Sequence, residues 1–154
     1  MDVSLKPMPR IVIVGSRFNG EIVDRLIETC VAELERDGVP TDGVRVYRVP
    51  GAFELPIAAQ AVLRSPDPPD VVICFGAVVR GETAHFEYVA GGAAEGILRV
   101  SLDGNRPVIF GVLTTDTLEQ AWDRADGAWR RGEDAARDAL EMIRLLRSLE
   151  PPGA

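Results

Sequence analysis

The stretch that decides the fold runs from Val71 to His85 and reads VVICFGAVVRGETAH. Its first five residues, 71–75, are apolar without interruption, which is typical of a strand buried on both faces of a parallel sheet. A helical pattern begins at the other end, so we expect the loop 76–85 to lie at the carboxyl end of a central strand. Ligands bind at that edge of open parallel sheets. The sequence therefore predicts a binding site beside His85, the only histidine in the chain.

The loop has the residue types of an anion site. Gly81 allows the backbone to approach a ligand closely, and Thr83 suits the cap position of the next helix, which we expect to span about 83–97. Unpaired amides at a helix start and the positive end of the helix dipole favour an anion such as phosphate. Arg80 precedes this turn, and we interpret it as an ordinary surface arginine.

Outward from this stretch, apolar runs alternate with helical patterns along the chain. The expected strands are 11–15, 44–49, 71–75 and 107–113, and the expected helices are 22–34, 55–63, 83–97, 117–126 and 131–149. A capping box at 117–120 marks the start of the fourth helix. The alternation predicts a three-layer α/β/α sandwich around a four-stranded parallel sheet, a flavodoxin-like fold.

The third helix contains an unusual run of small residues, 90–94, which reads AGGAA. Each glycine inside a helix costs about 1 kcal/mol relative to alanine. We therefore expect another helix to approach closely there, and copies of the chain packed around a symmetry axis would account for the same residues.

Composition narrows the class of protein. A length of 154 residues fits one domain, which we place at 10–149, with an N-terminal tail or edge segment at 1–9 and a C-terminal tail at 150–154. The net charge of −7 argues against a general binder of nucleic acid or anionic membrane. Cys30 and Cys74 are interpreted as small apolar fillers, not metal ligands. Without a signal peptide or membrane-span pattern, we expect a cytoplasmic protein.

The residues at the four strand ends resemble the lumazine synthase family. The matching motifs are in order and at the family's spacing across about 10–149, at 16–19 (SRFN), 49–56 (VPGAFELP), 76–86 and 110–125. The resemblance implies formation of 6,7-dimethyl-8-ribityllumazine, in the penultimate step of riboflavin biosynthesis. The implied substrates are 5-amino-6-(D-ribitylamino)pyrimidinedione and 3,4-dihydroxy-2-butanone 4-phosphate. The implied reaction is a transferase-type condensation with loss of phosphate and water, without a metal or organic cofactor.

The resemblance also assigns roles to individual residues. His85 matches the proton-transfer residue, and Phe18 matches the aromatic ring that stacks on the pyrimidine. The resemblance implies that the other assigned residues contact substrate. The ribityl chain and ring are contacted by Ala52, Phe53 and Glu54, and the pyrimidine by Ala77, Val78 and Val79. The phosphate is contacted by Glu82, Thr83 and Arg124, and Phe110 of a neighbouring subunit contacts the ring. The alternative for Glu54 is that it is only a favourable charge in a first helical turn.

One segment departs from the family pattern. The link before the last helix, 126–132 (DGAWRRG), is one residue shorter than usual. Arg131 replaces the family's lysine and keeps its positive charge, so it is a further expected substrate-binding residue. Arg130 stands where asparagine is usual.

The expected partners are the two small-molecule substrates and copies of the chain, with no nucleic acid and no membrane. Because Phe110 is expected to end an edge strand and to reach a neighbour's site, the resemblance implies a homo-oligomer built of pentamers. Family pentamers stay single, pair into decamers or close into sixty-subunit shells, and the sequence favours none of the three.

Two other functions remain open. One is an archaeal-type riboflavin synthase of similar fold, against which the intact turn at 81–85 argues. The other is a non-catalytic flavin- or lumazine-binding assembly, against which the retained His85 and Arg124 argue.

Overall fold

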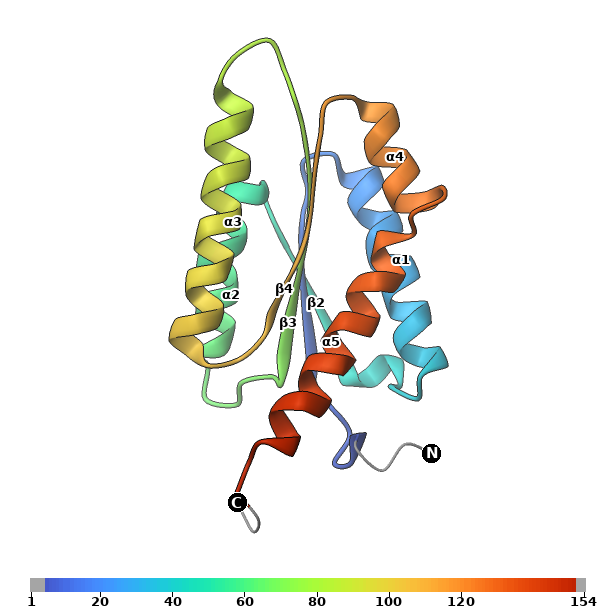
Figure 1. The fold of residues 1–154 in the computed structure, drawn as a ribbon, viewed down its shortest axis with the longest axis vertical. Coiled ribbons are helices and arrows are strands. Elements are labelled where there is room, and N and C mark those ends of the chain that lie inside the picture. The colour runs from blue at the N-terminus through green and yellow to red at the C-terminus, as the bar shows by residue number, and fades with distance from the viewer. Residues whose placement is uncertain (1–4, 152–154) are drawn as a thin grey trace.

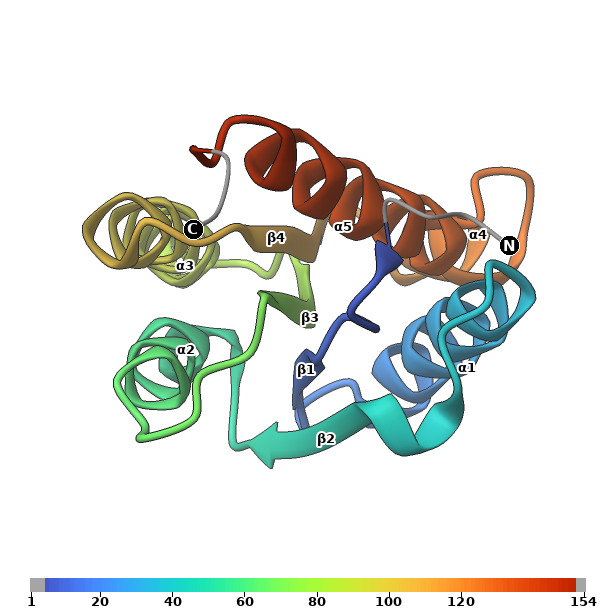
Figure 2. The same ribbon diagram turned by 90° about the horizontal axis from the view of Figure 1, so that it is seen from below.

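Four parallel strands form a single sheet (Figure 1), and their order is β2-β1-β3-β4 (Figure 2). The protein is represented by a computed structural model in which residues 5–151 are described. The strands are β1 (Ile11–Ser16), β2 (Val44–Val49), β3 (Val71–Val79) and β4 (Val108–Thr115). This order places β1 and β3 in the centre, where the sequence predicts buried strands, and leaves β2 and β4 at the edges.

Helices cover both faces of the sheet, so the predicted three-layer sandwich is confirmed (Figures 1 and 2). One layer consists of α1 (Gly20–Arg36), α4 (Leu118–Asp126) and α5 (Arg131–Ser148). The other consists of α2 (Leu55–Leu63) and α3 (His85–Gly104). Two short 3₁₀ turns, η2 (Thr41–Gly43) and η3 (Ala52–Glu54), flank β2.

The period-two alternation of side chains along a strand divides the core into two parts. Ile11 and Ile13 of β1 pack toward α1 and α5, whereas Val12 and Val14 pack toward α2 and α3. Leu5, just before β1, is also buried on the α1 side. The predicted tails fall partly on 1–4 and 152–154, which lie outside the described residues.

Several local predictions are confirmed. The capping box at the start of α4 is present, since Gln120 N donates to Thr117 Oγ1 at 3.1 Å and Thr117 N donates to Gln120 Oε1 at 3.2 Å. Cys30 and Cys74 are fully buried apolar fillers. Burial raises the pKa of both thiols to about 12. Neither is therefore a thiolate near neutral pH.

The expected boundaries around the central loop are wrong in three places. β3 continues to Val79 instead of ending near residue 75, because Gly76 to Val79 pair in register with Val112 to Thr115 of β4. The same pairing places Phe110 third in an eight-residue strand, not at its end. α3 begins at His85 with Ala84 as its N-cap residue, so Thr83 is not the cap.

The helix α3 is also longer than expected, ending at Gly104 instead of about residue 97. Ile97 and Val100 both face the core, so burial continues beyond the predicted end. The helix stops where Asn105 adopts a left-handed conformation with φ 50°.

The small residues of α3 have an explanation within one chain. A Cβ on Gly92 would lie 2.6 Å from the Phe53 ring, and one on Gly96 would lie 2.6 Å from Pro56. The expected close approach is therefore confirmed, and it is made by η3 and the start of α2. Gly91 faces open space, so the chain itself gives no reason for that glycine.

Candidate functional site

A cavity of about 790 Å³ opens at the carboxyl edge of the sheet, between the strand ends and the start of α3. It collects nine of the predicted site residues: Phe18, Ala52, Phe53, Glu54, Ala77, Val78, Val79, Thr83 and His85. We call it the main cavity. Its volume suits a ligand of the size of a heterocycle with a sugar-like chain.

The turn between β1 and α1 holds Phe18 at the mouth of this cavity. Phe18 N donates to Pro50 O at 3.0 Å, and Asn19 Nδ2 donates to Ala77 O at 2.8 Å, so the turn is tied to both neighbouring strand ends. Asn19 accepts the left-handed conformation that starts α1, with φ 54°. The Phe18 ring is left 71% exposed, which is unusual for a large apolar side chain that has no ligand.

The turn after β2 supplies a second exposed aromatic ring and a carboxylate. Gly51 N donates to Glu54 Oε1 at 3.0 Å, so one oxygen of Glu54 stabilises the 3₁₀ turn. Phe53 rests against Gly92 of α3 and is 59% exposed. Both interpretations of Glu54 thus have support, because it shapes the turn and also lines the main cavity.

The loop between β3 and α3 brings a hydroxyl and the histidine to the same cavity. His85 N donates to Thr83 Oγ1 at 3.3 Å, so the Thr83 hydroxyl satisfies a first-turn amide even though Ala84 is the N-cap residue. His85 and Thr83 are both exposed and line the main cavity. Glu82 is exposed in the same loop but does not line it. An imidazole beside a free helix start can exchange protons with a bound anionic substrate.

The other predicted residues lie together elsewhere. Phe110, Arg124 and Arg131 line a second cavity of about 210 Å³ along the exposed edge of β4, between that strand and α5. Arg124 donates to Gln120 O at 3.1 Å, and Arg131 pairs with Asp134 at 3.6 Å. We call this the edge cavity. Within one chain, Phe110, Arg124 and Arg131 therefore line a different cavity from His85.

The edge cavity is also lined by a carboxylate, Asp138, that belongs to none of the sequence motifs. Loss of hydration raises the pKa of Asp138 above its ordinary value, and the charges of Asp134 and Glu141 raise it further. Arg131 acts in the opposite direction.

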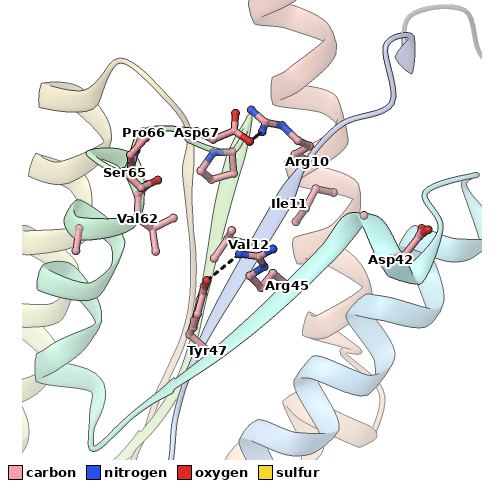
Figure 3. Close-up of a pocket in the computed structure, with 13 residues that line it drawn as sticks. Arg10, Ile11, Val12, Asp42, Arg45, Tyr47, Val62, Ser65, Pro66 and Asp67 are labelled. Atoms are coloured by element: carbon pink, nitrogen blue, oxygen red, sulfur yellow. Dashed lines mark hydrogen bonds and ion pairs between the residues drawn. The ribbon is translucent and has the colours of Figure 1, made fainter.

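A third cavity of about 580 Å³ lies near the amino ends of β1 and β2, between these strands and the end of α2 (Figure 3). It contains none of the predicted site residues. Two of its charged groups have partners, since Arg10 pairs with Asp67 and Arg45 donates to the Tyr47 hydroxyl at 3.4 Å (Figure 3). We do not place the functional site there.

Sequence reasoning missed two aromatic residues of the main cavity, Phe86 and Tyr88. Tyr88 is 75% exposed and lies three residues after His85, on the same side of α3. This three-residue spacing from His85 could have identified Tyr88 from the sequence.

Among the described residues, no group of three His, Cys, Asp or Glu side chains is placed to hold a metal ion. No helix in residues 5–151 has the length and hydrophobicity needed to span a membrane.

The fold and the main cavity define an open parallel α/β protein that binds a small molecule at the carboxyl edge of its sheet. Comparison with known proteins is more specific. Residues 8–147 match the family model for 6,7-dimethyl-8-ribityllumazine synthase. A protein of that name from Salinibacter ruber is 48% identical over 142 residues, which cover 92% of this chain and 90% of the relative. One from Protochlamydia amoebophila is 49% identical over 141 residues, which cover 91% of this chain and 81% of the relative.

The chain belongs to the 6,7-dimethyl-8-ribityllumazine synthase family. Its activity is that of a lumazine synthase, an enzyme of riboflavin biosynthesis. The family resemblance read from the motifs is thus confirmed.

Proposed function

We propose that this enzyme condenses 5-amino-6-(D-ribitylamino)pyrimidinedione with 3,4-dihydroxy-2-butanone 4-phosphate, and that each active site is built by two chains. The main cavity of one chain supplies the pyrimidine and phosphate contacts and His85. The edge cavity of its neighbour supplies Phe110, Arg124 and Arg131. A ring of such contacts, a pentamer, gives every chain one complete site.

The observation that supports this proposal is the division of the predicted residues between two cavities. Phe18 and Phe110 are 71% and 46% exposed, and Phe110 is the only aromatic residue that lines the edge cavity in the part of the chain that the structure describes. A flat heterocycle is bound well between two aromatic faces. Joining the main cavity of one chain to the edge cavity of the next supplies both faces and adds two guanidinium groups.

Such contacts are heterologous, because two different surfaces meet at each interface, and heterologous contacts form a ring when the rotation between neighbours closes. The exposed side of α3 is compatible with a central position in the ring. It carries Tyr88, Leu98 and Leu102, each more than half exposed, and Gly91, which faces open space. Packing of α3 against its copies would bury these apolar side chains.

The proposed reaction begins when the 5-amino nitrogen of the pyrimidine attacks the ketone carbon and water leaves, which gives an imine. Removal of the proton from C3 and departure of inorganic phosphate from C4 then leave an enol, which tautomerises to a ketone at C3. The ribitylamino nitrogen then attacks that carbonyl, and loss of a second water closes the ring. Every step moves a proton, and His85 is the side chain in the main cavity suited to do so.

Positive charge and hydrogen-bond donors would hold the phosphate during these steps. The start of α3 supplies amides and the Thr83 hydroxyl, while the neighbour's Arg124 supplies a guanidinium. Binding both reactants side by side also removes much of the entropic cost of a bimolecular step.

The direct test is to mix both substrates with the protein and to follow the absorbance of the lumazine product. The rate must be compared with a protein-free blank, because amines and ketones condense unaided. Product formed faster than the blank, at a rate proportional to protein, supports the proposal. Conversion of added lumazine into riboflavin would instead favour a riboflavin synthase, and tight flavin binding without turnover would favour a non-catalytic assembly.

A further inference from the structure

Arg80 connects the end of β3, the first turn of α3 and the turn between β4 and α4. Its guanidinium donates through Nε to Asp116 Oδ1 at 2.9 Å and through NH1 to Glu87 Oε1 at 3.0 Å. Asp116 lies in the turn between β4 and α4, and Glu87 lies in the first turn of α3. The guanidinium carbon also lies 4.5 Å from the centre of the Phe86 ring. Arg80 is exposed, as expected of a surface arginine, but its guanidinium is paired with two carboxylates.

The loop that Arg80 begins has little other support. Each of residues 80–84 is exposed, and a Cβ on Gly81 would find no atom within 4 Å. The backbone of Arg80 is fixed to the sheet, because its N donates to Thr115 O at 2.8 Å. Its side chain then reaches over the loop to Glu87, so that the two ends of the loop are joined by one residue.

Arg80 is also not placed to bind the substrate itself. It does not line the main cavity, although Gly81, Thr83, His85 and Phe86 do. Two carboxylates already accept hydrogen bonds from its guanidinium. A cation neutralised in this way attracts a phosphate only weakly, whereas an arginine with two fixed partners can hold a loop in one geometry.

We propose that Arg80 is a positioning residue, which holds loop 80–84 and His85 in the geometry that binds the phosphate ester by bridging Glu87 and Asp116. This inference rests on the proposed phosphate role of the loop. Exposed ion pairs contribute little to global stability, so the effect of Arg80 is expected in substrate binding more than in the melting temperature.

The first test is Arg80→Gln, measured in the complete oligomeric enzyme. The variant loses both ion pairs while keeping a polar side chain. We expect the KM for the butanone phosphate to rise roughly tenfold, because a displaced loop no longer holds its contacts in the geometry that binding requires, and the KM for the pyrimidine to change by less than about twofold. Arg80→Lys should recover only part of the loss, because one ammonium cannot bridge two carboxylates and stack on a ring.

The carboxylate partners separate positioning from direct contact. Glu87→Gln and Asp116→Asn leave the charge of Arg80 in place and each remove one ion pair. If Arg80 acts by position, both variants raise the KM for the butanone phosphate. If Arg80 touches the phosphate, freeing its guanidinium lowers that KM, and the inference is overturned.

Arg10→Gln is the matched control. The Arg10 side chain is 49% exposed, close to the 46% of Arg80, and it pairs with Asp67 near the amino ends of β1 and β2 (Figure 3). Both variants should lower the melting temperature by similar small amounts, and Arg10→Gln should leave both KM values unchanged. Equal KM changes in the two variants would show a general structural effect and overturn the inference.

Two further readouts distinguish failure of this inference from failure of the proposed function. Arg124→Ala, which removes the proposed phosphate contact, should raise the same KM. If it does so and Arg80→Gln does not, only the positioning role is wrong. Amide hydrogen exchange in residues 85–89 does not depend on activity. It should accelerate several-fold in Arg80→Gln but not in Arg10→Gln, and unchanged exchange would refute the positioning role even in an enzyme that makes no product.

Discussion

Two inactive variants should restore activity to each other when their chains are mixed. Phe18→Ala damages the main cavity and Phe110→Ala damages the edge cavity. Neither side chain belongs to the buried core, so each truncation removes little of the core and both variants should fold. Loss of stacking on a ring costs about 1–3 kcal/mol per contact, which lowers kcat/KM by roughly five- to 150-fold.

The size of the recovery follows from the division of the site. When the two variants are mixed in equal amounts and assemble at random, each interface combines the main cavity of one chain with the edge cavity of another. The identities of these two chains are independent of each other. Both are intact in about one quarter of interfaces, so activity should rise to about one quarter of the wild-type value per chain. The recovery should be greatest at equal amounts of the two variants.

The assay follows lumazine formation at substrate concentrations well below KM, after a cycle of dissociation and reassembly. Mass analysis of rings with one tagged variant establishes that chains have exchanged. A double variant, Phe18→Ala with Phe110→Ala, mixed with wild-type chains is the control. Its activity should fall from about one half to about one quarter of wild type on exchange. No recovery in fully exchanged rings of the single variants, or an active monomer, would refute the shared site.

Four single variants test other parts of the structure. His85→Ala should lower kcat by roughly 10²–10⁴, as expected for a general acid–base group, and a wild-type kcat across several pH values would exclude His85 from proton transfer. Arg124→Ala should raise the KM for the butanone phosphate far more than that for the pyrimidine, and equal increases in steady-state kinetics would contradict a phosphate contact. Gly92→Ala should push aside the ring of Phe53, which its Cβ would approach to 2.6 Å, and so weaken binding of a pyrimidine product analogue. Helix propensity offsets part of this clash by about 1 kcal/mol, so little change in thermal unfolding is expected. Asp138→Asn should raise the melting temperature at pH 7, because the folded state disfavours the charged carboxylate whose pKa is raised. The gain should shrink as the pH falls through that raised pKa and vanish below about 3.8, the ordinary value, and a pH-independent gain would point to another cause.

Features that depend on neighbouring residues in the sequence were predictable. The capping box at 117–120 and the apolar runs of β1 and β3 are local patterns, and the structure has both. The motifs at the strand ends were equally informative, because all of them follow parallel strands and must therefore lie at one edge of the sheet.

Features that depend on tertiary contact were not predictable. β3 is extended through Val79 by pairing with β4, which its own sequence does not encode. A glycine is required at position 92 because the Phe53 ring, thirty-nine positions earlier in the chain, packs against it. The side chain of Arg80 is held partly by Asp116, thirty-six positions later. The same limitation applies to the site. The motifs identify its residues, but only the three-dimensional arrangement separates those of the main cavity from those of the edge cavity.

The burial of both cysteines makes the protein suitable for site-specific labelling without prior removal of native thiols. Cys30 and Cys74 are the only cysteines in the chain, both have no exposed surface, and the pKa of each is raised to about 12. Maleimides react with exposed thiolates, so the native pair should remain unmodified in the folded protein. A cysteine introduced at Gly91 would then carry the only fluorophore on each chain. Energy transfer between such fluorophores would report ring assembly in real time.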